Sequence, residues 1–156
     1  MSNDNVNMNL DQLLDGTLDD LADLPEFKPF PCGSHRATMK LEVKKIGEHN
    51  AVEVGFVAIE TVELADTTKA PVNAGDATSV LYFLTHSNPK VAEIGQGKFK
   101  ELMKSLAEHF GAKSNRDLMA DGNGAEVMII TDLRDEKKDG KKTGKQFTEL
   151  VALSVV

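Results

Sequence analysis

The clearest periodic pattern in the chain is a stripe of apolar residues within residues 97–111. These residues lie at i, i+3, i+4, i+7, i+8 and i+11, namely Phe99, Leu102, Met103, Leu106, Ala107 and Phe110. This spacing places them on one face of an α-helix and leaves the intervening lysines and glutamates for solvent. Gly111 follows at a position where helices commonly end. We therefore predict one amphipathic helix that packs on a neighbouring layer.

Three segments before this helix alternate apolar and polar residues with the period of a β-strand. The first begins at Arg36, and the other two are residues 51–64 and 78–84. The residues expected to face inward are Met39, Leu41 and Val43 in the first segment and Val52, Val54, Phe56 and Ala58 in the second. In the second segment Gly55, with apolar residues on both faces, indicates a bulge or a strand that is covered on both sides.

Two further strand-like segments, residues 125–133 and 146–156, end the chain and predict a hairpin. Its connection, residues 134–145, holds six basic and three acidic residues, which gives a local charge of 6 − 3 = +3. The basic residues are Arg134, Lys137, Lys138, Lys141, Lys142 and Lys145. We expect a flexible loop here. Such a loop serves either as a solubility device or as a mobile contact for nucleic-acid phosphates.

The predicted elements run in the order of three strands, one helix and two strands. This is the element order of a five-stranded, OB-like Greek-key barrel with an amphipathic helix between strands three and four. We therefore expect a mainly β fold for residues 29–156.

The net charge of the chain is concentrated at its beginning. Residues 1–27 hold seven acidic and no basic residues, so they account for the whole formal charge of −7. Six leucines recur there at helical spacing: Leu10, Leu13, Leu14, Leu18, Leu21 and Leu24. We interpret residues 1–28 as an acidic, partly helical or disordered arm. The arm either packs on its own domain, enters a partner's groove or stays disordered.

The residue types give little support for catalysis or for a bound cofactor. The single cysteine, Cys32, has no second cysteine or histidine at metal-ligand spacing and cannot form an internal disulfide, which fits a reducing cytoplasm. The four histidines are scattered: His35, His49, His86 and His109. Residues 95–97 lack a phosphate-loop pattern, and we interpret them as a hinge before the helix. With no membrane-spanning run or secretory signal, we expect a cytoplasmic, non-enzymatic protein without a metal.

The motifs from residue 31 onward carry a family resemblance. They are PCGSH at residues 31–35, GKFKELMKSLAEHFG at 97–111 and AEVMIITDLRDEKKDGKKTGKQFTELVALSV at 125–155. In their order and spacing they resemble the bacteriophage single-stranded DNA-binding-like OB-fold proteins, which are small early-gene products. The resemblance implies a non-enzymatic protein that binds single-stranded DNA during replication or recombination in the host cytoplasm.

The resemblance also implies roles for particular residues. The six basic residues of 134–145, together with Lys40 and Lys44, would contact phosphates, and Tyr82 would stack on a base. The other aromatic candidates for stacking are Phe56, Phe83 and Phe147. The six leucines of the arm would bind replication or recombination proteins, or a second copy of the chain.

An alternative hypothesis uses the arm alone. In it, the chain is a protein–protein interaction module without affinity for nucleic acid. It would be a phage factor that binds a host or phage protein through its acidic, leucine-rich arm. The two hypotheses differ in whether the basic loop or the acidic arm is indispensable.

Overall fold

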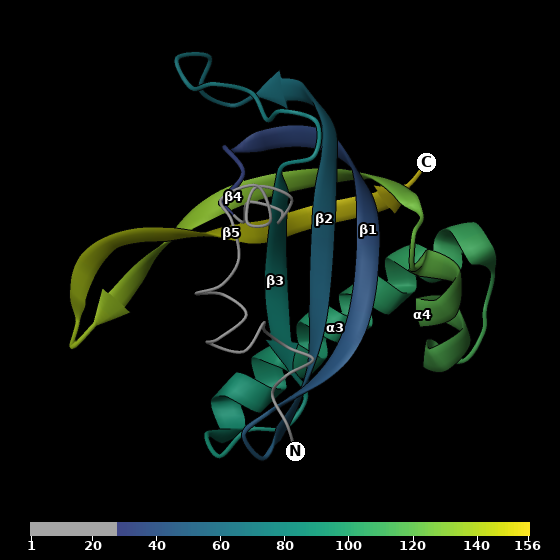
Figure 1. The fold of residues 1–156 in the computed structure, drawn as a ribbon. Coiled ribbons are helices and arrows are strands. Elements are labelled where there is room, and N and C mark those ends of the chain that lie inside the picture. The colour runs from purple at the N-terminus through teal and green to yellow at the C-terminus, as the bar shows by residue number, and fades with distance from the viewer. Residues whose placement is uncertain (1–27) are drawn as a thin grey trace, which may run out of the picture.

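The computed structural model describes residues 28–156, a mainly β domain with five strands and two helices (Figure 1). The interpretations of the arm concern residues 1–27, which lie outside the described residues. In chain order the elements are β1 (Gly33–Ile46), β2 (His49–Leu64), β3 (Ala77–Phe83), α3 (Pro89–Phe110), α4 (Asn115–Gly122), β4 (Glu126–Lys138) and β5 (Lys141–Val155). The predicted order of three strands, a helix and two strands is confirmed, and α4 is an additional short helix.

All five strands belong to one antiparallel sheet with the order β3-β2-β1-β4-β5. The register between β1 and β2 shifts twice, which leaves Ile59 and Val62 of β2 without a partner on β1. Gly55 pairs with Lys40 in regular register. The irregularity expected in this strand is therefore present, but it lies beyond Gly55, where the bulges bend the long β2 strand.

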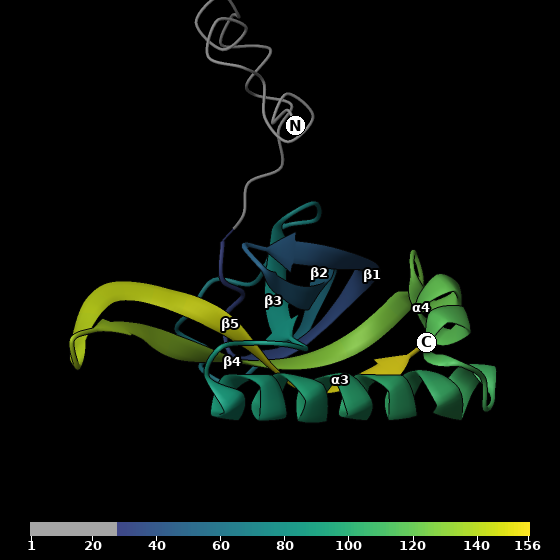
Figure 2. The ribbon, with the colours of Figure 1, turned by 90° about the horizontal axis from the view of Figure 1, so that it is seen from below.

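The sheet curls without closing into a barrel, so the closed barrel expected from the sequence is not formed. Helix α3 lies across the open side and packs against both β3 and β5 (Figure 2). The two strands are instead joined by side chains, because the hydroxyl oxygens of Thr78 and Thr148 lie 2.7 Å apart. The Thr148 hydroxyl also accepts a hydrogen bond of 3.0 Å from the backbone N–H of Phe30. Phe30 and α3 thus fill the space that a β3–β5 ladder would otherwise close.

Helix α3 is longer than the apolar stripe predicted, because it begins at Pro89 rather than near residue 97. The side chain of Asn88 caps its first turn by accepting the N–H of Lys90, and proline is well suited to the next position. The hinge predicted at residues 95–97 is wrong, since these residues lie inside the helix. Gly95 is buried there against the backbone of Phe83, where the close approach leaves no room for a side chain.

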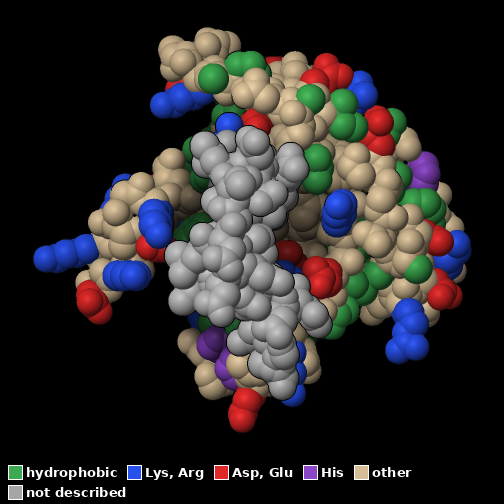
Figure 3. Space-filling view, in the orientation of Figure 1, with side chains coloured by type: hydrophobic (Ala, Val, Ile, Leu, Met, Phe, Trp, Pro, Cys, Tyr) green, Lys and Arg blue, Asp and Glu red, His purple; other side chains and the backbone are tan. Residues whose placement is uncertain are grey.

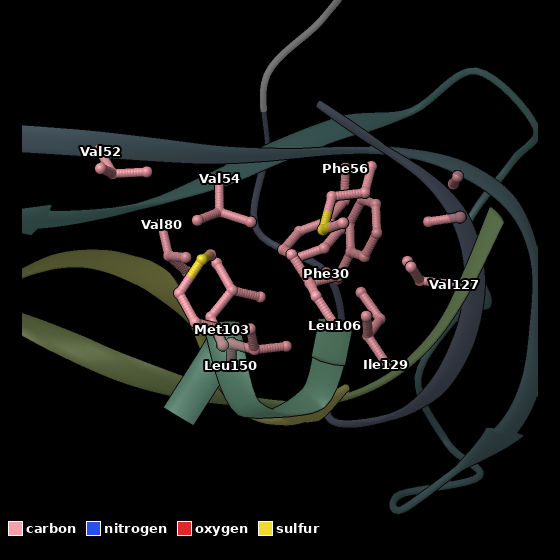
Figure 4. Packing of buried hydrophobic residues seen from close by; sticks show 14 of the residues in the cluster. Phe30, Val52, Val54, Phe56, Val80, Met103, Leu106, Val127, Ile129 and Leu150 are labelled. Atoms are coloured by element: carbon pink, nitrogen blue, oxygen red, sulfur yellow. The ribbon is translucent and has the colours of Figure 1, made fainter. Parts of the chain in front are cut away.

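The core lies between the concave face of the sheet and α3 (Figure 4). The predicted inward residues of β2 and the central residues of the α3 stripe are all buried: Val52, Val54, Phe56, Ala58, Leu102, Met103 and Leu106. Phe30, which precedes β1, is fully buried beside Phe56 and Leu106 (Figure 4). The prediction is wrong for Val43, whose side chain is 64% exposed. β4 pairs with β1 only as far as Thr38, so the second half of β1 extends beyond the core.

His35 is the largest polar residue of this interior and is fully buried. Its Nε2 lies 2.8 Å from the carbonyl oxygen of Pro31, and its Nδ1 lies 3.0 Å from the hydroxyl of Thr61. That hydroxyl accepts the N–H of Val72, so we assign its proton to the bond with Nδ1 and the ring proton to Nε2. The contacts therefore suit a neutral ring. Burial lowers the pKa of His35, and the hydrogen bond to Pro31 opposes this effect.

We expect this buried ring to make the protein less stable in mild acid. Below a pH of about 6.5 an unfolded histidine takes up a proton that the folded His35 resists, so acid favours unfolding. The contribution of the neutral His35 ring to the free energy of unfolding is complete above that pH. It is lost as the pH falls through the lower pKa that His35 has in the folded state. Urea unfolding at several pH values compares the unchanged protein with the His35→Gln variant, which keeps the other histidines. An identical pH dependence in the two proteins would contradict the assignment.

Candidate functional site

The ends of β4 and β5 project from the rest of the sheet as a two-stranded ribbon (Figure 1). β1 pairs with β4 only up to Thr131, so residues 134–147, here called the basic ribbon, pair only with each other. Asp139 and Gly140 form its tip with φ angles of 53° and 78°, as a two-residue type I′ turn requires. The prediction of a flexible loop at residues 134–145 is therefore wrong. The hairpin strands simply continue through the charged segment.

The basic residues of the ribbon are largely free of acidic partners. Within residues 28–156, Lys142 is the only one of the six that lies within 4.0 Å of a carboxylate, 3.2 Å from Asp135. Hydrogen bonds from Gln146 and then Lys142 lower the pKa of Asp135. Lysine side chains accordingly gather along the projecting ribbon in Figure 3. Arg134, Lys137, Lys138, Lys141 and Lys145 are therefore available to an external anion.

An exposed aromatic ring lies at the base of the ribbon. Phe147 is 42% exposed, and the guanidinium carbon of Arg134 lies 5.9 Å from the centre of its ring. The two residues are cross-strand partners and so share one face of the ribbon. The neighbouring Thr148 points to the opposite face, where it is buried. The ring offers a flat apolar surface on which a base can stack, and the guanidinium offers a positive charge for the phosphate of that nucleotide.

Tyr82, the residue expected to stack on a base, lies elsewhere. Its side chain lines a cavity of about 200 Å³ between α3 and β5, together with Leu102 and Leu150. Burial, together with the smaller effects of the nearby carboxylates of Glu101 and Glu149, raises the pKa of Tyr82 to about 12. The structure therefore does not bring this ring to the exposed face of the basic ribbon.

Lys40 and Lys44 are also separated from the ribbon. They belong to the half of β1 that extends beyond β4, and Lys44 is paired with Glu53 at 3.0 Å. Gly33 of β1 pairs with Thr131, the last residue of β4 to pair with β1 before the ribbon. Lys40 lies seven residues further along β1, which corresponds to about 23 Å of strand. It lies opposite Gly55, which leaves the surface beside it open. Any nucleic acid that reaches both the ribbon and Lys40 must cross the outer face of the sheet.

The structure brings together three rings that the sequence does not mark as a group. The imidazoles of His49 and His86 stack with their centres 4.6 Å apart. The ring of Phe83 packs edge-on against both, with centre-to-centre distances of 6.4 Å to His49 and 5.1 Å to His86. All three are partly exposed at the end of β3 nearest α3. The interpretation of the histidines as scattered is therefore wrong for this pair.

The described residues offer no evident metal site or reactive thiol. No group of three or more histidine, cysteine, aspartate or glutamate side chains in residues 28–156 is arranged to hold a metal ion. The thiol of Cys32 donates a hydrogen bond of 3.2 Å to Asp132. Burial and this hydrogen bond raise the pKa of Cys32, which keeps it protonated and unreactive. Neither helix of the described region is long and apolar enough to cross a membrane.

No protein-family model matches the chain, and no curated protein matches it at a significant level.

Proposed function

We propose that this protein binds single-stranded DNA through the basic ribbon, without catalysing a reaction, and acts in DNA replication or recombination. The observation that carries the proposal is the exposed ring of Phe147 among five basic residues that have no acidic partner within the described region. Stacking on an aromatic ring requires a base that is not already stacked in a duplex, which favours a single strand. Because Tyr82 faces α3, the proposal assigns the stacking contact to Phe147.

The strand order supports an open, OB-like version of the fold. β4 returns after a long connection to lie beside β1, and the resulting order β3-β2-β1-β4 is the observation that favours a Greek key. The helix that fills the gap between β3 and β5 follows β3, as it does in the arrangement expected from the sequence. In OB folds the ligand contacts the face of strands two and three and the loop between strands four and five. Here the loop between strands four and five corresponds to the basic ribbon. His49 begins β2 and Phe83 ends β3, so these two rings and His86, which packs against them, lie at one end of the β2–β3 face.

Binding should depend strongly on salt, because most of the contacts are between lysines and phosphates. Each phosphate neutralised on a single strand contributes about −0.7 to the slope of log K against log salt, so five contacts predict a slope of about −3.5. Fluorescence anisotropy with labelled oligo-dT, oligo-rU and duplex DNA over a range of salt concentrations measures this directly. Salt-sensitive binding with a preference for the single strands supports the proposal. The absence of binding even at low salt would contradict it and favour the protein–protein interaction module.

Replacing Phe147 by alanine should weaken binding to oligo-dT by about 5- to 150-fold, since one base–aromatic stack contributes about 1–3 kcal/mol. The slope with salt should stay unchanged, because no charge is removed. Val151→Ala is the matched control, since it removes another exposed apolar side chain from β5 and should leave affinity unchanged. Equal losses in the two variants, or no loss in either, would show that Phe147 does not stack on a base.

A further inference from the structure

A cleft of about 350 Å³ lies at the root of the basic ribbon, beside the first described residues of the chain. Its walls come from residues 28–31, from the loop between β2 and β3, and from Leu133 and Gln146 at the start of the ribbon. Pro71, Val72 and Leu133 supply apolar surface within it. The cleft is therefore suited to apolar side chains that arrive from outside the described domain.

The charged residues that line this cleft are Lys28, Lys69 and Asp76, which gives an excess of one positive charge. Asp76, the one acidic residue that lines the cleft, lies 3.3 Å from Lys28, and Asp135 of the adjoining ribbon lies 3.2 Å from Lys142. Lys69 also lines the cleft and is exposed, with no carboxylate of residues 28–156 within 4.0 Å. The cleft thus combines an apolar floor with a cationic edge that continues onto the basic ribbon. Its chemistry matches a segment with leucines on one face and carboxylates on the other.

The chain itself supplies such a segment next to the cleft. The N–H of Lys28 donates a hydrogen bond of 3.0 Å to the carbonyl of Ala77, which fixes the chain at the rim. Leu24 precedes Lys28 by only four residues, a span of at most about 14 Å. We infer that residues 10–24 bind this cleft in the same molecule, with leucines on its apolar floor and acidic residues facing the lysines. This inference deepens the proposed function and rests on it, because the acidic residues of the bound arm would compete with nucleic-acid phosphates for the lysines of the adjoining basic ribbon.

The arm then acts as a built-in competitor of nucleic acid. If it occupies the cleft about nine-tenths of the time, the apparent affinity for oligo-dT falls about tenfold, since only the open fraction binds. Salt weakens the arm's contacts as well as those of DNA, so the inhibition is greatest at low ionic strength. Replacing Leu14 and Leu21 by serine in the full chain should therefore tighten binding by about tenfold at low salt.

The chain contains no tryptophan, so a single tryptophan placed in the arm reports its surroundings. In the full-length Leu18→Trp variant we expect the blue-shifted emission of an apolar site. This emission should not change with protein concentration, because the contact is within one molecule. Val6→Trp, outside the leucine-rich segment, should emit as in water. A water-like emission from the Leu18→Trp protein, or a blue shift that appears only at high concentration, would overturn the inference.

A charge placed in the cleft identifies the binding site. Ala70 lines the cleft and is exposed, so Ala70→Glu should repel the arm without disturbing the fold and return the tryptophan emission to its water-like value. Ala74→Glu adds the same charge to the same loop outside the cleft and should have no effect. Equal effects of the two changes would overturn the assignment to this cleft. A bound arm in a protein that fails to bind oligo-dT would refute the proposed function and leave the arm contact standing.

Discussion

Replacing Gly95 by alanine is expected to destabilise the protein by about 3 kcal/mol, although the change lies in the middle of a helix where alanine is normally preferred. The new methyl group would overlap the carbonyl oxygen of Phe83, and backbone atoms on both sides cannot move aside as a flexible side chain can. Helix α3 would have to shift away from β3, which would loosen its cover of the core. Chemical denaturation measures the change in the free energy of unfolding.

Gly97 provides the matched control, because it lies two residues further along the same helix and a methyl group added there would meet no neighbouring atom within 4 Å. At this position the same substitution should stabilise the protein by up to about 1 kcal/mol through helix propensity alone. Similar effects of the two substitutions would contradict the close packing of α3 on β3.

Neutralising the basic ribbon should have the largest effect on nucleic-acid binding. The variant replaces Lys137, Lys138, Lys141 and Lys145 by glutamine and leaves Lys142 in its pair with Asp135. Four lost phosphate contacts should lower the affinity for oligo-dT by about 10²- to 10³-fold at about 0.1 M salt and reduce the salt slope by about 3. The four side chains are exposed, so the free energy of unfolding should change little.

Helix α3 offers a control with the same change in charge. Replacing Lys90, Lys98, Lys100 and Lys104 by glutamine alters the net charge equally on another part of the surface. If the two variants lose affinity to the same extent, binding depends on net charge alone, and the basic ribbon has no special role.

The sequence predicted those parts of the fold that local periodicity determines. Val52, Val54 and Phe56 alternate along β2, and Leu102 and Leu106 follow helical spacing, so each faces the core as predicted. The start of α3 was missed because the apolar stripe is weak before residue 97, and Ile94 is in fact 58% exposed. The Asn88–Pro89 pair, a capping residue followed by proline, is the signal that could have identified it.

The candidate site could not be predicted from apolar periodicity, because its strands do not pack on the core. Strands without a core have no apolar alternation, so the ribbon was predicted as a loop, although its Asp139–Gly140 pair is a strong hairpin signal. The exposure of Phe147 follows from the inward position of Thr148, a polar residue that the core accepts because Thr78 and Phe30 bond to it. The open side of the sheet results from the packing of α3 between distant strands. Such long-range contacts have no local sequence pattern.

Amide chemical shifts of the ¹⁵N-labelled full-length protein, recorded during titration with oligo-dT, locate the nucleic-acid contact residue by residue. We expect the largest shift changes at residues 134–147, with Phe147 among them, and no change for residues of α4. Shifts confined to α3 and α4, or no shifts at low salt, would contradict binding of single-stranded DNA by the basic ribbon.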